Sequence, residues 1–333
     1  MGTNYEELVQ GFGGVKVTVV GDLMLDRYLA GRVQRISPEA PVPVVEVERV
    51  FERPGGAGNV ATNTQRLGAP TTIIGIIGAD PDGERLKDVL ASEELSVGAL
   101  VQSSTQPTTV KTRVVAHGQQ IVRVDREASA SVEGDLAEQL LAAFDAAPSD
   151  VVILSDYAKG VLSPVVCAEV IRRARTRGIP VVVDPKGRDY QRYQGATAVT
   201  PNQAEAILAI GGDGSGELKL DQLREFLLGE LRLDAALVTR GERGMTLLLP
   251  EEAPISFPAT AREVADVTGA GDTAVSVFAL GLATGADFAR ATFVANVAAG
   301  LAVGRAGAVA ISPGELLEAL QPHHVPRARR ARG

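Results

Sequence analysis

Short strand-like runs and longer helix-like segments alternate through much of the chain, and this alternation constrains the fold more than any other feature. Across residues 131–239, runs rich in β-branched residues are separated by apolar-periodic segments, most of them about 10 to 15 residues long. Parallel strands joined by right-handed helical crossovers produce this order. We therefore predict an α/β fold with a mostly parallel sheet flanked by helices.

The boundaries of the expected elements follow from the same runs. We expect strands at 15–20, 71–77, 97–102, 150–155, 179–184, 196–200, 235–239, 245–249 and 254–258, and helices at 60–67, 82–94, 132–146, 164–177, 202–210 and 218–231. The first strand ends at Gly21-Asp22 and is expected to deliver a loop, through Asp26, to the carboxyl edge of the sheet. Ligands bind at this edge in open α/β sheets.

Two segments do not fit the parallel pattern. Residues 36–50 hold three prolines before an alternating run, which excludes a central strand and favours an edge or an excursion from the sheet. Residues 109–116 and 120–125 flank a His117-Gly118 turn and alternate apolar with basic side chains, as a two-faced hairpin does. We predict that two segments, about 32–52 and 108–126, form a small β-sheet lid on a single domain spanning 1–333.

Composition limits the functional classes. The formal net charge of -8 argues against a nucleic-acid surface, and the basic cluster at 327–332 is expected to be a solvated tail. Charged residues interrupt the most apolar stretch, 274–310, which therefore predicts two core helices and no membrane span. A single cysteine, Cys167, excludes an internal disulfide framework. We expect a cytoplasmic protein that has neither nucleic-acid nor membrane partners.

A glycine-rich turn, Gly269-Ala270-Gly271-Asp272, leads directly into an apolar run. Such a turn leaves backbone N–H groups unpaired at the start of a helix, where the helix dipole also favours anions. Asp272 is then either a helix cap or a reactive carboxylate beside the bound anion. The turn alone leaves both interpretations open.

Motifs elsewhere in the chain favour the second interpretation. In order along the chain they are Gly55-Gly56 with Asn59, Thr200-Pro-Asn-Gln-Ala-Glu205, Thr239-Arg-Gly-Glu-Arg-Gly244 and Asp266-Val-Thr-Gly-Ala-Gly-Asp272. Together they resemble the ribokinase-like (PfkB) family of sugar kinases, from about residue 15 to 311. The resemblance implies a ribokinase-like fold and ATP-dependent phosphorylation of a sugar hydroxyl. The phosphate loop of P-loop enzymes and the protein-kinase motifs are both missing from the sequence.

Three further strings look like one subgroup of that family. They are Arg35-Ile-Ser-Pro-Glu-Ala-Pro-Val-Pro-Val44, Glu52-Arg-Pro-Gly-Gly-Ala-Gly-Asn59 and Asp184-Pro-Lys186. The subgroup phosphorylates D-glycero-D-manno-heptose 7-phosphate at C1, on the way to activated heptose. Relatives fused to a nucleotidyltransferase continue beyond this region, and we expect no such domain here. Another sugar, sugar phosphate or nucleoside is the alternative acceptor, and a non-catalytic sugar-phosphate binding protein is a third interpretation.

The resemblance implies a role for each motif residue. Asp272 looks like the general base, and the N–H groups of Gly269, Ala270 and Gly271 look like the anion hole for the transferring phosphoryl group. A positioned carboxylate and preorganised donors suit phosphoryl transfer. Asp266 and Thr268 match positions that hold a monovalent cation, such as K⁺, in some relatives.

On the nucleotide side, Asn202 and Glu205 resemble the pair that organises Mg²⁺ and the ATP phosphates, with Glu205 acting through water. The same two residues also fit an ordinary capping box. Thr239, Gly241 and Gly244 look like nucleotide-loop positions, for which a plain turn is the alternative. Asn296 is a candidate for the adenine, or simply a polar helix residue.

On the acceptor side, Asp26, Gly56 and Asn59 match residues that line the sugar site in the family. The substrate phosphate needs cations, and the candidates are Lys111, Arg113, Arg123 and Lys186. On a two-faced ribbon such residues can also be the solvated face. Family analogy further implies a homodimer formed through the lid strands, because an exposed edge strand favours pairing.

Overall fold

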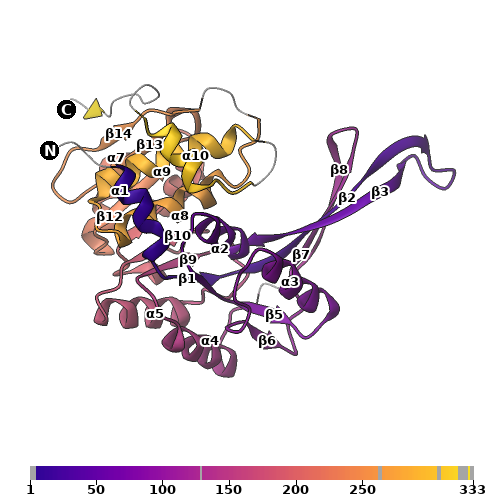
Figure 1. Cartoon of the computed structure of the whole chain (residues 1–333), viewed down its shortest axis with the longest axis horizontal. Coiled ribbons are helices and arrows are strands. Elements are labelled where there is room, and N and C mark those ends of the chain that lie inside the picture. The colour runs from indigo at the N-terminus through magenta and orange to yellow at the C-terminus, as the bar shows by residue number, and fades with distance from the viewer. Residues whose placement is uncertain (1–4, 128–129, 262–264, 306–308, 322–328, 331–333) are drawn as a thin grey trace.

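The computed structural model describes residues 5–127, 130–261, 265–305, 309–321 and 329–330. Of the predicted solvated tail at 327–332, only Arg329–Arg330 is described, and these two residues form a short strand of the main sheet, which the tail prediction did not anticipate. Helices and a large sheet form the main body, and a long, narrow lid projects from it (Figure 1). The α/β architecture and the separate lid were both predicted from the sequence, and both are confirmed.

The main sheet has nine strands in the order β15-β14-β13-β12-β11-β10-β9-β1-β4. Its members are β1 (Val17–Gly21), β4 (Thr71–Ile74), β9 (Val151–Ser155), β10 (Val181–Asp184), β11 (Ala198–Val199), β12 (Ala235–Thr239), β13 (Met245–Leu248), β14 (Ile255–Phe257) and β15 (Arg329–Arg330). Every pair from β4 to β12 is parallel, and the pairs beyond β12 are antiparallel. The carboxyl ends of six strands therefore share one edge.

Helices cover both faces of this sheet. One face packs against α1 (Tyr5–Gln10), α2 (Ala57–Arg66), α3 (Pro81–Ser92), α8 (Ala270–Ala283), α9 (Phe288–Val303) and α10 (Pro313–Ala319). The other packs against α4 (Gly134–Ala146), α5 (Pro164–Thr176), α6 (Gln203–Ala209) and α7 (Leu220–Arg224). In β9, Val151 and Ile153 belong to the first core, and Val152 and Leu154 belong to the second. This double burial explains why the central strands are continuous apolar runs.

The lid is a four-stranded sheet in the order β3-β2-β7-β8. Its strands are β2 (Leu23–Ile36), β3 (Pro43–Gly56), β7 (Val110–Ala116) and β8 (Gln119–Arg126). The expected loop through Asp26 was wrong, because this residue lies on β2. Leu23, Met24 and Leu25 are all buried at the root of the lid, so the alternation that reveals a strand is missing there.

The two faces of the lid differ in chemistry. Cross-strand pairs put Asp26, Arg53 and Lys111 in one row, and Tyr28, Phe51 and Arg113 in the next row on the same face. The Tyr28 and Phe51 rings stack with their centroids 4.7 Å apart. The opposite face, which we call the outer face, carries the apolar row Val50, Leu29, Val114 and Val122.

Two other expectations needed correction. The strand expected at 71–77 divides at Gly75 into β4 and β5 (Ile76–Gly78), and β5 pairs with β6 (Val101–Ser103) in a separate two-stranded sheet. The helix expected at 218–231 is shorter, because α7 passes into a wider π-type turn over Glu225–Glu230. In the described ranges, the helices are too short or too polar to span a membrane.

Double burial of the sheet predicts the cost of core substitutions. Ile153→Ala and Leu154→Ala should each lower the free energy of unfolding by about 2–5 kcal/mol, because each leaves a cavity in a different core. Val165→Ala on α5, where the residue is 55% exposed, should cost no more than about 0.5 kcal/mol. Urea denaturation measures all three, and a small cost at either β9 position would contradict coverage of that face.

Candidate active site

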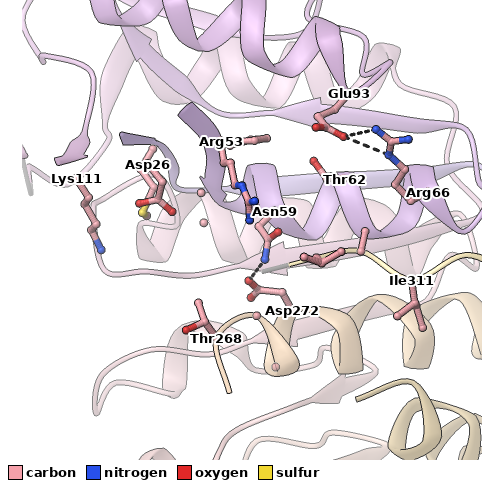
Figure 2. Close-up of a pocket in the computed structure, with 18 of the residues that line it drawn as sticks. Asp26, Arg53, Asn59, Thr62, Arg66, Glu93, Lys111, Thr268, Asp272 and Ile311 are labelled. Atoms are coloured by element: carbon pink, nitrogen blue, oxygen red, sulfur yellow. Dashed lines mark hydrogen bonds and ion pairs between the residues drawn. The ribbon is translucent and has the colours of Figure 1, made fainter. Parts of the chain in front are cut away.

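A cavity of about 760 Å³ lies between the lid and the N-terminal ends of α2 and α8. Figure 2 shows that its side chains come from widely separated segments, with Lys111 and Asp26 on the lid, Asn59 on α2 and Asp272 on α8. Its lining also includes residues of the segment before α10, such as Ile311. The cavity therefore brings together the lid and the glycine-rich turn that the sequence had singled out.

The turn forms the start of α8 as predicted. Gly269 is the N-cap residue and adopts a left-handed conformation, with φ of 81°. Ala270 N–H donates to the carbonyl of Val267 at 3.3 Å. The N–H groups in the first turn of a helix have no carbonyl acceptor within the helix. A Cβ built on Gly271 would have no other atom within 4 Å, so the space beside this backbone is open. An anion could approach this backbone closely.

Asp272 is buried, and donors from two other elements hold its carboxylate. Asn59 Nδ2 donates to Oδ2 at 2.5 Å, and the Tyr157 hydroxyl donates to Oδ1 at 2.7 Å. Burial raises the pKa of Asp272, while these two hydrogen bonds act in the opposite direction. Tyr157 was missed in the sequence, where nothing in its local pattern indicates a partner on α8.

The glycine pair before α2 brings Asn59 to this position. Gly56 has φ of 59°, and a Cβ there would lie 2.4 Å from the carbonyl oxygen of Asp22. A Cβ on Gly55 would lie 2.5 Å from an Asp26 carboxylate oxygen. Only glycine fits both sites, since the first needs a left-handed backbone and the second a close approach.

Basic and acidic side chains of the lid face the same cavity. Arg113 donates to Asp26 at 2.6 Å, and Arg53 also lines the wall. Lys111 is half-buried, and burial is the main cause that lowers the pKa of its ammonium group. In the part of the chain that the structure describes, Lys111 forms no salt bridge, so the cavity contains a cation with unused donors. Arg123 is exposed, pairs with Asp125 and does not line the cavity.

Asn202 and Glu205 lie at the start of α6 and form the capping box that the sequence allowed. Asn202 accepts a hydrogen bond from the Glu205 N–H at 3.0 Å, and Glu205 accepts one from the Asn202 N–H at 3.0 Å. Lys186 donates to the other Glu205 carboxylate oxygen at 2.7 Å. Lys186 therefore lies on the Asn202 side of the site and outside the lid cavity, which differs from its expected place beside the substrate phosphate.

Three of the remaining nucleotide-side candidates lie at or just after the end of β12, and the fourth lies on α9. Thr239 forms a bridge with Asn202, and its N–H donates to the carbonyl of Pro201 at 2.9 Å. Gly241 and Gly244 form the turn from β12 to β13, both with positive φ. Asn296 lies on α9, where its amide donates to the Pro258 carbonyl at 2.8 Å. Its donor group is thus already engaged in the protein.

A partly buried carboxyl group, Asp184, lies at the end of β10 between these two sides. Burial raises its pKa well above the usual range, and Asp272 and Glu205 raise it further. Within the described ranges, no cluster of three or more acidic, histidine or cysteine side chains could hold a metal ion. Both carboxylate oxygens of Glu205 already accept hydrogen bonds, so Glu205 has little capacity to bind a metal ion directly. A Mg²⁺ ion near Glu205 would instead contact it through water and be held by ATP phosphates.

The two monovalent-cation candidates flank the same turn. Thr268 lines the cavity, and its N–H donates to an Asp266 carboxylate oxygen at 2.9 Å. Residues 262–264, which precede Asp266, lie outside the described part of the chain. The geometry holds the Asp266 carboxylate next to the glycine-rich turn.

Comparison with known protein families identifies the family of this chain. The family model described as pfkB family carbohydrate kinase matches residues 15–314. The chain therefore belongs to the pfkB family of carbohydrate kinases, and membership implies ATP as the phosphoryl donor.

Its curated relatives include proteins named bifunctional protein HldE. The protein from Citrifermentans bemidjiense is 48% identical over 306 residues, which is 91% of this chain and 63% of that protein. The protein from Caulobacter sp. strain K31 is 46% identical over 321 residues, covering 96% and 65%. The chain thus spans slightly less than two thirds of the length of these relatives.

Solved structures show the same fold. Escherichia coli phosphofructokinase-2 in complex with potassium superposes with a TM-score of 0.76 at 22% identity, covering 91% of this chain and 97% of that one. Arabidopsis thaliana ribokinase complexed with ribose and ATP gives a TM-score of 0.70 at 20% identity, covering 92% and 99%. The expected ribokinase-like architecture is confirmed.

Proposed function

We propose that this protein transfers the γ-phosphoryl group of ATP to the C1 hydroxyl of D-glycero-D-manno-heptose 7-phosphate. One observation carries the proposal: the cavity has the buried Asp272 carboxylate at a helix N-terminus on one wall and, on the other, Lys111, which forms no salt bridge with any described residue. A sugar that carries a phosphate away from its reacting hydroxyl would meet both. The subgroup motifs and the HldE relatives support this acceptor.

In the proposed reaction, Asp272 accepts the proton of the C1 hydroxyl as its oxygen attacks the γ-phosphorus. The bond between phosphorus and the ADP oxygen breaks, and ADP leaves. The N–H groups at the start of α8 stabilise the charge on the transferring group, because they point out of the end of the helix. The Ala270 N–H has to exchange its contact with the Val267 carbonyl for the phosphoryl oxygen. Asn202 and Glu205 would hold Mg²⁺ with the ATP phosphates. When bound, Mg²⁺ would neutralise part of the negative charge of the phosphates.

Lys186 takes a different role in this proposal from the one expected. Burial alone would lower its pKa, but the nearby carboxylates, Glu205 first and then Asp184 and Asp156, together raise the pKa, so the ammonium stays charged. A charged ammonium beside Glu205 suits the phosphates of ATP. Lys111 and Arg113 remain the candidates for the sugar phosphate, since both line the cavity.

Other parts of the proposal rest on less direct support. We propose that residues 1–333 act as one kinase domain with a lid, and that Asp266 and Thr268 hold a K⁺ ion beside the turn. A cytoplasmic location agrees with the single buried Cys167. The ADP- or GDP-forming step that follows would belong to a nucleotidyltransferase.

Replacement of the base should abolish turnover and leave binding nearly intact. Asp272→Asn should lower kcat by about 10²–10⁴-fold, because the amide cannot accept the hydroxyl proton. Dissociation constants for ATP and for the sugar should stay within about threefold by calorimetry. Asp287→Asn makes the same change at the N-cap of α9 and should be neutral. Retention of more than about a tenth of the activity in Asp272→Asn would refute the role.

Phosphate recognition by Lys111 predicts the acceptor preference. In an ADP-release assay over heptose 7-phosphate, heptose, fructose 1-phosphate, ribose and a nucleoside, the first should give the highest kcat/KM. Lys111→Gln should raise its KM about 10- to 100-fold, the value of one charge-assisted hydrogen bond, and leave KM for ATP unchanged. Lys87→Gln on α3, which breaks a surface ion pair with Glu84, is the control. Equal turnover of unphosphorylated heptose would overturn the acceptor assignment.

The outer face of the lid supports the proposal of a homodimer. Val50 is 56% exposed and Val122 is 48% exposed, and both belong to the apolar row of that face. A contiguous apolar surface on a projecting sheet is typical of a protein interface. The same row on a second copy is the partner proposed here.

Charges on this row should therefore separate the subunits. Val50→Glu combined with Val122→Glu should convert the dimer to a monomer in sedimentation velocity, because two carboxylates would be buried against apolar side chains. Val165→Glu on α5, where the residue is 55% exposed, should leave the dimer intact. A wild-type protein that is monomeric at micromolar concentration would contradict the proposal.

A further inference from the structure

The structure assigns a function to Tyr157, which lies in the loop between β9 and α5. We propose that Tyr157 is a positioning residue that orients the Asp272 carboxylate and keeps it ready to accept the substrate proton, and that the loop 156–160 is built to hold the hydroxyl there. This inference rests on the proposed role of Asp272 as the base. It adds a donor that neither the family motifs nor the sequence patterns indicate.

The buried carboxylate of Asp22 holds this loop in place. Asp22 is 0% exposed and follows β1, and it accepts hydrogen bonds from the N–H groups of Tyr157, Lys159 and Val161 at 2.8, 2.9 and 3.0 Å. A carboxylate that receives three backbone donors fixes the path of the chain. The Tyr157 backbone is thus tied directly to the end of the first strand.

A second carboxylate holds the loop from the other side. Asp156 accepts hydrogen bonds from the Ala158 N–H and from the Tyr193 hydroxyl, both at 2.7 Å, and pairs with Arg192 at 2.9 Å. Between these anchors, Ala158 adopts φ of 56°, a left-handed conformation that is unfavourable for alanine. Strain of this kind persists only where the surroundings enforce it, and it clusters at functional sites.

The hydroxyl of Tyr157 contributes to the electrostatics of Asp272. The groups that face Asp272 are Tyr157 and Asn59, which donate to it, and the carboxyls of Asp26 and Asp184. Burial and Asp26 raise the pKa of Asp272, so the two donors are what favour its ionised form. Burial, followed by the charge of Asp272, raises the pKa of Tyr157 well above its usual range. The phenol therefore stays protonated and donates.

Tyr157→Phe removes this hydroxyl and leaves the ring. Without the donor the pKa of Asp272 rises, so more of it is protonated at a given pH and the acidic limb of the kcat profile moves to higher pH. The expected shift is about one pH unit, which lowers kcat by at most about 10-fold at any one pH. Loss of the orienting hydrogen bond should lower kcat about 10-fold further at every pH. KM for ATP and for the sugar should stay within about twofold, because the hydroxyl contributes to proton transfer and not to binding.

Tyr190→Phe is a matched control. The Tyr190 hydroxyl is buried, and no hydrogen-bond partner for it exists in the described part of the chain, so its removal should leave both kcat and the pH profile unchanged. Both variants should melt close to the wild type by calorimetry. Fluorotyrosine introduced at position 157 makes a stronger donor, and it should move the acidic limb to lower pH.

Several results would overturn the inference. They are an unchanged kcat for Tyr157→Phe, an equal loss of kcat at every pH with no shift of the acidic limb, or an increase in KM alone. Each would leave the base role of Asp272 intact, provided that Asp272→Asn is inactive. An active Asp272→Asn would instead refute the base role itself, so the two failures are distinguishable.

Discussion

Burial of both faces of the parallel strands is the constraint on which the rest of the structure depends. Because helices cover each face, polar side chains that serve a ligand can only gather where the strands end. β1, β9, β10, β11 and β12 end at the same edge. The residues at the ends of these strands or just after them include Asp22, Tyr157, Asp184, Asn202 and Thr239. A structural constraint on the core thus selects the location of the site.

The lid supplies what the sheet edge lacks. The sheet edge and α8 together place donors and carboxylates at the cavity, while the lid adds the cations Arg53, Lys111 and Arg113 and the ring of Tyr28. One face of the lid carries this polar set, and the other carries an apolar row. Because successive side chains of a strand point to opposite faces, the same four strands supply both the polar face and the apolar face. The proposed acceptor site and the proposed subunit interface therefore lie on opposite faces of the same four strands.

Sequence patterns predicted the parts of the molecule in which local chemistry and structure agree. The alternation across 131–239 gave the α/β class, and the prolines of 36–50 indicated a segment outside the sheet. Glycine positions were also informative, because Gly56 and Gly269 adopt conformations that other residues disfavour. The loop expected at Asp26 failed because the root of the lid is buried on both faces. The place of Lys186 was not predictable, because its contact with Glu205 depends on where two loops end.

By itself, the sequence determined the fold class, the separate lid and the glycine-rich turn that carries Asp272, since each depends on residues that are close together in the chain. The tertiary structure alone decided which groups surround that carboxylate. Asn59 and Tyr157 are separated from Asp272 by 213 and 115 positions, and no periodic pattern links residues at such distances. Their meeting depends on the order of strands in the sheet and on two buried carboxylates, Asp22 and Asp156, that fix one loop. Packing, and not local propensity, made Asp272 a buried carboxylate held between two donors.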